Sequence, residues 1–407
     1  MVTIADPPAF ELWLKDRSSR DSLAIANRAA LRVAQAFWQW HPGQREHNTT
    51  AFPMLRLLFV AGVALKHPTR EIQQAVAAAA AVAETAAHNA HQIAVASVQI
   101  AVRRHIRAAD ESALSVAGVA AAFFADENSL AEFAAKRVVT HSSTVVVSAR
   151  EQGSLAVGLP FEINTTFWSN ISADCSLVEA HQDPSLYPLW AAAPLPAIEE
   201  NWLKARASFA EDPGKAWAFW TRWWDAVLAG APLDWALQHD IALIPDAVWQ
   251  AGPGPVAEAI AGIEERFDLR AQVAVLKDQL RRSTLVAVQQ PASPAHRSHN
   301  QPPELLEVET NVRREITIIW AALDEAETEL AKDAPSSSVL RRVGAGLVDA
   351  AKRLLSSLTS EAITSAKKAV VASALSVLVV AAAPYANRVI EIGKALIDFA
   401  TKLLGGS

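Results

Sequence analysis

The residues of this chain that could bind a metal ion are two histidines in an alanine-rich stretch. His88 and His91 are three positions apart, so a helix places both imidazoles on one face. That spacing can hold a metal ion, but no carboxylate stands at the matching position and the HExxH arrangement is absent. The pattern favours two histidines at a surface or a helix interface, and it predicts no metal site.

Acid–base and nucleophilic chemistry have two further candidates. His239 could act as a general base with Asp225 or Asp234, but the spacing selects neither carboxylate. Cys175 is the single cysteine and has no histidine motif around it, so we interpret it as a buried structural thiol. The chain contains no P-loop, GxGxxG, GxSxG or CxxC pair. The sequence therefore predicts no catalytic residue and no cofactor, with an enzyme site assembled from distant residues as an alternative.

Tryptophans dominate the stretch that contains these acid–base candidates. Seven of the thirteen lie between Trp202 and Trp249, and spacings of three and four place Trp217, Trp220 and Trp224 on one helical face. We interpret the block as hydrophobic core, because each indole buries a large area. The alternative is an aromatic face that binds a protein partner, since tryptophan is enriched in binding hot spots. The candidates for that face are Trp217, Trp220, Trp223, Trp224, Arg222, Trp235 and Trp249.

Helices are expected to position most of these residues, so the predicted fold class is mainly α. It comprises an alanine-rich helical bundle with a tryptophan-rich helical module, then a separate C-terminal helical module joined by a proline-rich linker. Residues 8–40 predict one helix, or two with a break near Ser18. Apolar residues recur along it at helical spacing, while Arg28 and Arg32 lie on other faces of the helix.

The chain changes character after its alanine-rich helices. Residues 69–109 predict a long helix, and a second helix over 111–140 is expected to fold back on it. Beyond them, β-branched and turn residues predict a short strand pair near 143–148 and 161–167. The proline-rich stretch up to Pro196 is expected to wrap irregularly over the helical core.

Composition shifts divide the chain into two parts. Residues 1–285 form a predicted domain, which the tryptophan-rich block at about 196–265 closes. Residues 286–304 are rich in proline, serine, glutamine and histidine, as is typical of a linker. Residues 305–407 form the predicted C-terminal helical module.

Eighteen uncharged residues, 369–386, form the most apolar segment of the C-terminal module. Their length is at the lower limit for crossing a bilayer, and Pro384 stands near the end. Small residues four positions apart favour close helix contacts in lipid or in an oligomer. An amphipathic helix over 389–404 would lie on a membrane or cover the apolar helix. We favour a buried helix over membrane insertion; the candidate membrane or oligomer contacts are Ala369, Ser373, Ser376, Leu378 and Phe399.

Charge and composition exclude some classes of protein. The formal net charge is −6 and the pI is about 6.0, which argues against nucleic-acid binding through bulk positive charge. A single cysteine precludes an intramolecular disulfide framework. Acidic residues interrupt the first thirty positions, so no secretory signal is indicated. We therefore expect a cytoplasmic protein, either peripheral or anchored by its C-terminus at the inner membrane if the apolar segment contacts lipid.

Two stretches resemble recurrent blocks of uncharacterised bacterial proteins that have an alanine-rich helical N-terminal half. The first is the motif WxxWWDxxLxG from Trp220 to Gly230, followed by IALIPDAVWQAGPGPV. The second is the linker sequence His299 to Glu304, HNQPPE, which is similar to a GHNxPPE module, although Ser298 replaces its glycine. The resemblance implies a modular bacterial architecture and transfers no catalytic residue.

Three functions are compatible with these patterns. The first hypothesis is a non-enzymatic interaction or scaffold protein, in which the tryptophan module binds a protein partner and the C-terminal module self-associates or binds a membrane. The second is a membrane-active bacterial effector, a toxin or defence protein acting through residues 339–404. The third is an enzyme with a site near the tryptophan block that no motif marks.

Overall fold

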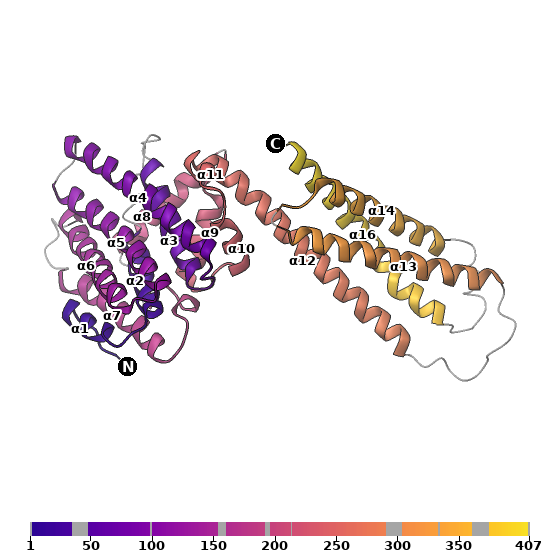
Figure 1. Ribbon diagram of the computed structural model, residues 1–407, viewed down its shortest axis with the longest axis horizontal. Coiled ribbons are helices and arrows are strands. Elements are labelled where there is room, and N and C mark those ends of the chain that lie inside the picture. Colours follow the sequence, from indigo (N-terminus) through magenta and orange to yellow (C-terminus); the bar gives the residue numbers. More distant parts are fainter. Residues whose placement is uncertain are drawn as a thin grey trace. The chain divides into compact units, whose positions relative to one another are not determined.

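The computed structural model describes residues 2–34, 48–97, 100–153, 160–191, 196–212, 214–289, 303–332, 334–359 and 374–405. The regular elements in these ranges are helices, which confirms the predicted mainly α fold class (Figure 1). The alanine-rich composition accounts for this outcome, because alanine has the highest helix propensity.

The helices form two compact units, Met1–Ala261 and Gly262–Ser407. The boundary lies inside a single helix, α12 (Pro253–Gln289), and not at the predicted position near 285. The reason is that the second half of α12 contributes Leu269, Val273 and Leu276 to the core of unit 2. Of the predicted linker, residues 290–302 lie outside the described part of the chain.

Unit 1 is built around α2 (Ser19–Val33), which is buried along most of its length. A reciprocal capping box begins the helix: Ser18 Oγ accepts from the backbone N–H of Asp21, and the Asp21 carboxylate accepts from the N–H of Ser18. This cap separates α2 from α1 (Pro7–Leu14), which confirms a break near Ser18. The neighbours that pack against α2 are α3 (Asn48–Ala64), α5 (Ile100–Phe124), α6 (Asn128–Gly153) and α7 (Pro160–Glu179).

The sequence predicts two long helices over 69–109 and 111–140, whereas the structure has three helices in this part of the chain. They are α4 (Arg70–Ser97), then α5, and then α6 after a short turn at Ala125–Glu127. The helix that packs most closely on α5 is α6, where Ser112 and Ser142 share a buried hydrogen bond of 2.7 Å. Small side chains at this contact allow the two backbones to approach.

The predicted strand pair is wrong. Residues 143–148 belong to α6, and residues 161–167 belong to α7. Tertiary packing overrides the β propensity of the β-branched residues here, because Val138, Val139 and Val145 are all buried on the inner face of α6. The later part of unit 1 contains shorter elements: η3 (Pro184–Leu186), α8 (Pro196–Ala210), α9 (Ala218–Ala229), α10 (Trp235–Ala242) and α11 (Asp246–Gln250).

Unit 2 consists of the second half of α12 together with α13 (Pro303–Leu330), α14 (Ser337–Thr359) and α16 (Ala374–Gly405). Its apolar core draws on all four helices, and α14 packs against both α13 and α16. The buried positions recur at spacings of three and four, as in Leu340, Val343 and Leu347.

The sequence predicts two helices at the C-terminus, over 369–386 and 389–404, but the described residues there form a single helix. Continuous helix α16 runs through Pro384 and buries Phe399 in the core of unit 2. The candidates Ala369 and Ser373 lie outside the described residues, whereas Ser376 and Leu378 fall within α16. Among the helices described, none has the length and apolar character needed to cross a membrane.

Two glycines set the distance between α14 and α16. A Cβ atom added at Gly344 would lie 2.5 Å from the carbonyl oxygen of Gly393, and one added at Gly393 would lie 2.8 Å from the carbonyl oxygen of Gly344. The helix backbones are therefore in direct contact at this crossing. Gly346, two residues along α14, has open space where its Cβ would be.

We predict that Gly344→Ala and Gly393→Ala each destabilise unit 2 by about 1–3 kcal/mol, because the added methyl groups meet backbone that cannot rotate away. Gly346→Ala is the matched control and should stabilise the unit by up to about 1 kcal/mol through helix propensity. Hydrogen exchange of peptides from α14 and α16 measures this stability separately from that of unit 1. Equal exchange in all three variants would show that the backbones are not in contact.

Asp110 of α5 is a buried carboxyl group in unit 1. Burial, and then the charge of neighbouring Glu111, raise its pKa from 3.8 to about 7. Between these two pH values the unfolded chain has released the proton that the folded chain still holds. The free energy of unfolding therefore falls as the pH rises from 3.8 to about 7, and this contribution is constant above that pH.

Asp110→Asn should consequently stabilise unit 1 at pH 8 by up to about 4 kcal/mol, with the gain shrinking towards pH 5. Urea unfolding followed by tryptophan fluorescence measures this, since twelve of the thirteen tryptophans belong to unit 1. Exposed Asp126→Asn is the control and should leave the pH profile unchanged. A gain that does not vary between pH 5 and pH 8 would contradict a buried, protonated Asp110.

Candidate functional site

The tryptophan-rich block forms an inward-facing aromatic cluster around α9 and α11. Phe52 and Phe59 of α3 insert into it, and Phe59 lies edge-on to Trp220 and Trp223 with ring centroids 5.8 and 5.5 Å apart. The cluster is thus core, as the sequence predicts. Five of the candidates for a partner-binding face are at most 4% exposed: Trp217, Trp220, Trp223, Trp224 and Trp249.

Trp235 differs from those five because it is only half-buried. It is the first residue of α10, whose N-terminus is capped by the Asp234 carboxylate through the backbone N–H groups of Ala236 and Leu237. The ammonium group of Lys66 lies 5.3 Å from the centre of its indole ring. This distance is within the range of a cation–π contact.

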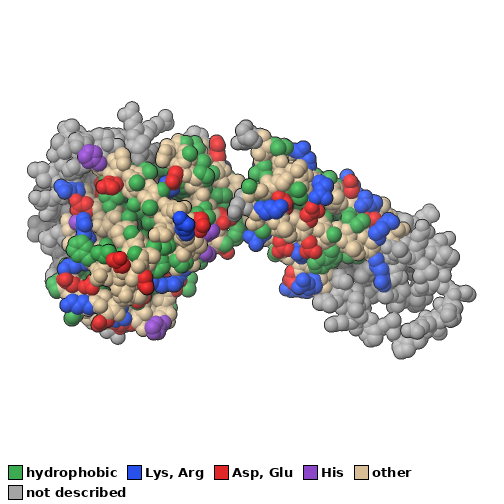
Figure 2. Space-filling model, in the orientation of Figure 1, with side chains coloured by type: hydrophobic (Ala, Val, Ile, Leu, Met, Phe, Trp, Pro, Cys, Tyr) green, Lys and Arg blue, Asp and Glu red, His purple; other side chains and the backbone are tan. Residues whose placement is uncertain are grey.

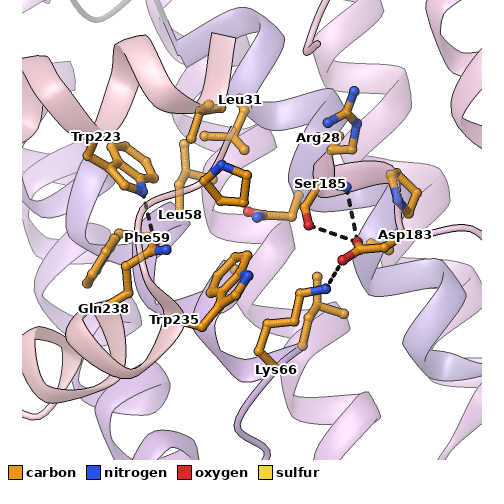
Figure 3. A pocket seen from close by; sticks show the side chains of 17 residues that line it. Arg28, Leu31, Leu58, Phe59, Lys66, Asp183, Ser185, Trp223, Trp235 and Gln238 are labelled. Carbon is orange, nitrogen blue, oxygen red and sulfur yellow. Dashed lines mark hydrogen bonds and ion pairs between the residues drawn. The ribbon is translucent and has the colours of Figure 1, made fainter. Parts of the chain in front are cut away.

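One face of Trp235 lines a cavity of about 70 Å³ (Figure 3). Helices α2, α3, α9 and α10 enclose it, together with the turn at η3. The apolar part of the wall comprises Leu31, Leu58, Phe59, Leu65, Val227 and Pro232. Gly62 of α3 faces Asn27 of α2 in this wall, and an added Cβ would lie 3.1 Å from the Asn27 amide nitrogen.

The polar groups of the cavity lie at two places. On one side Lys66 pairs with Asp183, which also accepts hydrogen bonds from the backbone N–H and the hydroxyl of Ser185. Burial alone would raise the pKa of Asp183, but the hydrogen bonds from Lys66 and Ser185 lower it overall. On the other side Gln238 accepts from the indole N–H of Trp223 at 3.2 Å. The side-chain oxygen of Asn27 is buried without a hydrogen-bond partner.

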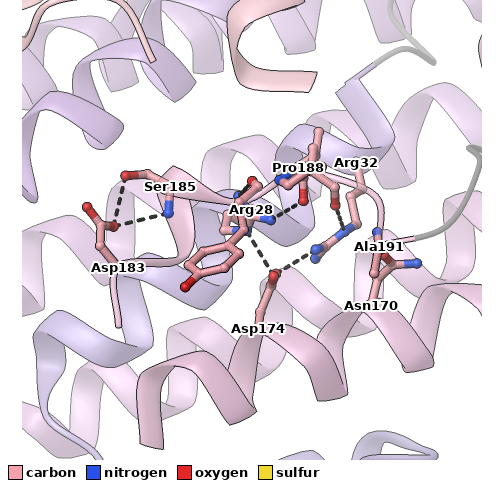
Figure 4. A network of polar contacts seen from close by, with 10 residues as sticks. Arg28, Arg32, Asn170, Asp174, Asp183, Ser185, Pro188 and Ala191 are labelled. Atoms are coloured by element: carbon pink, nitrogen blue, oxygen red, sulfur yellow. Dashed lines mark hydrogen bonds and ion pairs between the residues drawn. The ribbon is translucent and has the colours of Figure 1, made fainter. Parts of the chain in front are cut away.

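A buried ionic network, drawn in Figure 4, shares Arg28 with the lining of the cavity. Arg28 and Arg32 of α2 both pair with Asp174 of α7, at 3.0 and 2.6 Å. The two guanidinium groups also donate to backbone carbonyls of the segment that follows η3: Arg28 to Tyr187 and Pro188, and Arg32 to Leu189. The network therefore ties α2, α7 and this segment together, and the segment follows directly on η3 and the Asp183–Ser185 side of the cavity.

Gly230 also packs against this segment, at Tyr187 and Pro188. It ends α9 in the left-handed conformation with φ 67°, and an added Cβ would lie 2.1 Å from the carbonyl carbon of Tyr187. The backbone N–H of Leu189 donates to the carbonyl oxygen of Leu228 nearby. Only glycine fits both the conformation and the contact.

The acid–base candidates are not brought together. His239 lies 3.4 Å from Asp240, Asp225 pairs with Arg206 at 3.2 Å, and Asp234 serves as the helix cap. Arg222 is exposed on α9.

The candidate metal ligand His88 and the candidate nucleophile Cys175 are not placed in a reactive site either. His88 is exposed on α4, which also carries His91. In the described part of the chain no group of histidine, cysteine and carboxylate residues could hold a metal ion. Cys175 is buried as expected, and burial together with Asp174 raises the pKa of its thiol, so it is a poor nucleophile at neutral pH.

Sequence reasoning missed the polar residues of this region. Arg28 and Arg32 were expected away from the apolar face of their helix, yet both are buried, because α2 is surrounded on all sides. Their spacing of four positions was the available signal, since it places both guanidinium groups on one side of the helix. Lys66 and Asp183 are far apart in the sequence, and no motif marks either of them.

Comparison of the chain with protein-family models, with curated proteins and with solved structures finds no match. The geometry of the structure is therefore the basis for the proposals below.

The network itself can be tested with two carboxylates of α7. Asp174→Asn should destabilise unit 1 by about 3–5 kcal/mol, because it leaves two buried guanidinium groups without a counter-charge. Glu179→Gln weakens the partly exposed pair with Arg17 and should cost at most about 1 kcal/mol. Urea unfolding followed by tryptophan fluorescence compares the two variants. Similar losses in both would show that the Asp174 pair is not desolvated.

Proposed function

We propose that the protein is a non-enzymatic interaction protein that binds a protein partner at the cavity beside Trp235. The observation that carries this proposal is the half-buried indole of Trp235 at the edge of a cavity that has both apolar walls and polar groups. Partly exposed tryptophans beside pockets are typical hot spots of protein interfaces, where they bury large areas at low cost in conformational entropy.

The lining of the cavity indicates what the partner presents. Aliphatic walls formed by Leu31, Leu58 and Val227 suit the end of one apolar side chain. The Lys66–Asp183 pair beside the cavity offers a donor and an acceptor to polar groups flanking that side chain. A volume of about 70 Å³ admits part of a side chain and not a cofactor-sized molecule.

The remaining functions stay predictions. Self-association or membrane binding through unit 2, and a membrane-active effector role of residues 339–404, depend in part on the segment 360–373, which lies outside the described residues. An enzyme site near the tryptophan block would need a general base, and His239 and Asp240 are the polar pair closest to that requirement.

Trp235→Ala should weaken partner binding by about 2 kcal/mol, roughly thirtyfold, as expected when a hot-spot residue is removed. Ala24→Phe, which fills the cavity from α2, should have a similar effect. Quantitative affinity purification of the full chain from the cells that produce it measures the recovery of each partner. Arg222→Ala, an exposed change on α9, is the control and should retain the partner.

The proposal is contradicted if both cavity variants fold like the original protein, by circular dichroism, and recover the same partners in the same amounts. It is also contradicted if Arg222→Ala loses the partner as completely as Trp235→Ala does.

A further inference from the structure

An open groove of about 390 Å³ lies on unit 1 and shares no lining residue with the cavity beside Trp235. Its lining comes from α4, α5 and α6. Helix α5 packs against both of the others and lies between them, as Figure 1 shows. The groove therefore has α5 as its floor and α4 and α6 as its two walls.

Small side chains form much of the floor and parts of both walls. They are Ala117 and Gly118 of α5, Ala80 of α4 and Ala134 of α6. A Cβ atom added at Gly118 would lie 3.4 Å from the Cβ of Ala134, so α5 and α6 are close at this point. Side chains this short leave a hollow that a larger side chain of another molecule can enter.

A large apolar side chain stands beside this hollow. Phe133 of α6 lines the groove and is 62% exposed, and Leu130, three positions earlier on the same helix, is 54% exposed. Residues three positions apart are neighbours on one face of a helix, so the two side chains form an apolar ridge. A single exposed apolar residue is ordinary, but an exposed aromatic ring next to a hollow of small residues is typical of an interface.

Two charged residues on opposite walls of the groove are unpaired. Glu84 of α4 and Arg137 of α6 both line the groove and are exposed. Within the described part of the chain, the side chain of neither residue makes an ion pair or a hydrogen bond. By contrast, Glu111 of the floor is already paired, with Arg107 at 2.7 Å and with His141 at 3.1 Å. The groove thus presents an unpaired anion on one wall and an unpaired cation on the other.

A surface that binds a second copy of itself must be complementary to itself. In a two-fold symmetric dimer the same patch lies on both sides of the interface, so each projection needs a hollow and each charge an opposite charge within that patch. The groove provides both, because Phe133 matches the hollow between α4 and α6, and Arg137 matches Glu84. A second copy of the chain is therefore the occupant that these features select.

We propose that two copies of the chain associate through this groove. Phe133 of each copy enters the groove of the other, and Arg137 of each copy pairs with Glu84 of the other. The dimer and the partner-binding cavity beside Trp235 depend on different residues, so one can form without the other.

Sedimentation equilibrium of the full chain at micromolar concentrations tests the proposal, and the original protein should show a monomer–dimer equilibrium. Phe133→Asp should raise the dissociation constant of the dimer at least about tenfold, because it removes the main apolar contact and places a charge there. Leu203→Asp is the matched control. Leu203 is 55% exposed on α8 and does not line the groove, so this variant should dimerise like the original protein.

Reversing the two charges tests the pairing itself. Glu84→Arg and Arg137→Glu each place like charges opposite each other at both contacts of a symmetric interface, so each variant alone should dimerise at least about tenfold more weakly. An equimolar mixture of the two variants should form dimers again, because each copy then carries the charges that the other needs. Both residues are exposed, so circular dichroism should show unchanged helix content in both variants.

The proposal is overturned if the original protein stays monomeric, or if Phe133→Asp dimerises as well as Leu203→Asp. It is also overturned if the mixture of charge variants is no more dimeric than either variant alone. A dimer that persists in all three groove variants would place self-association elsewhere, such as in unit 2, and would overturn the assignment. Trp235→Ala should retain the dimer, so a failure of this proposal can be distinguished from a failure of the partner-binding proposal.

Discussion

The packing of α3 into the tryptophan cluster is the contact on which the rest of unit 1 depends. Phe52 contacts Trp217, Trp220 and Trp249 with ring centroids 5.6–5.9 Å apart. About two turns further along α3, Phe59 lies edge-on to three rings of α9. Edge-to-face pairs of this kind contribute about 0.5–1.5 kcal/mol each beyond the burial of their area. They fix α3 against α9 and α11, and with them one wall of the Trp235 cavity.

Polar interactions refine this aromatic packing without supplying most of its stability. Trp223 donates to Gln238, and the guanidinium of Arg56 lies 4.7 Å from the ring of Trp249 while pairing with Asp246. By contrast, the indole N–H of Trp220 is buried without an acceptor. Leaving a buried donor unpaired costs about 1–3 kcal/mol of stability, and burial of the ring must more than offset that cost. Apart from buried groups such as those of the Asp174 network, charged side chains lie mostly at the surface. Figure 2 shows acidic and basic groups intermingled on the face that it displays.

Local sequence rules were sufficient for the features that depend on neighbouring residues. The helical class, the break at Ser18 and the burial of the tryptophans all follow from spacing, capping chemistry and residue size. The same rules failed where distant segments decide the outcome. The β-branched residues of α6 were assigned to a strand because their burial is not visible locally. Arg28 and Arg32 were placed only away from the apolar face of their helix, because their partner Asp174 is far away in the sequence.

The candidate site was only partly predictable for the same reason. Trp235 was among the candidates, but nothing in its local sequence distinguishes it from the buried tryptophans around it. Trp235 is the first residue of α10, whose N-terminus Asp234 caps, and its indole is in contact with Lys66 at the edge of the cavity. The pairing of Lys66 with Asp183 joins segments separated by more than one hundred residues, and only the fold brings them together.

The central claim is that the tryptophan cluster is core and that Trp235 is the candidate available to a partner. Fluorine NMR of the full chain labelled with 5-fluorotryptophan, assigned by single Trp→Phe substitutions, tests it most directly. A soluble gadolinium chelate should broaden the Trp235 resonance and leave those of Trp217, Trp220, Trp223, Trp224 and Trp249 sharp. Equal broadening of all six would show that the cluster is an exposed surface and would contradict the account.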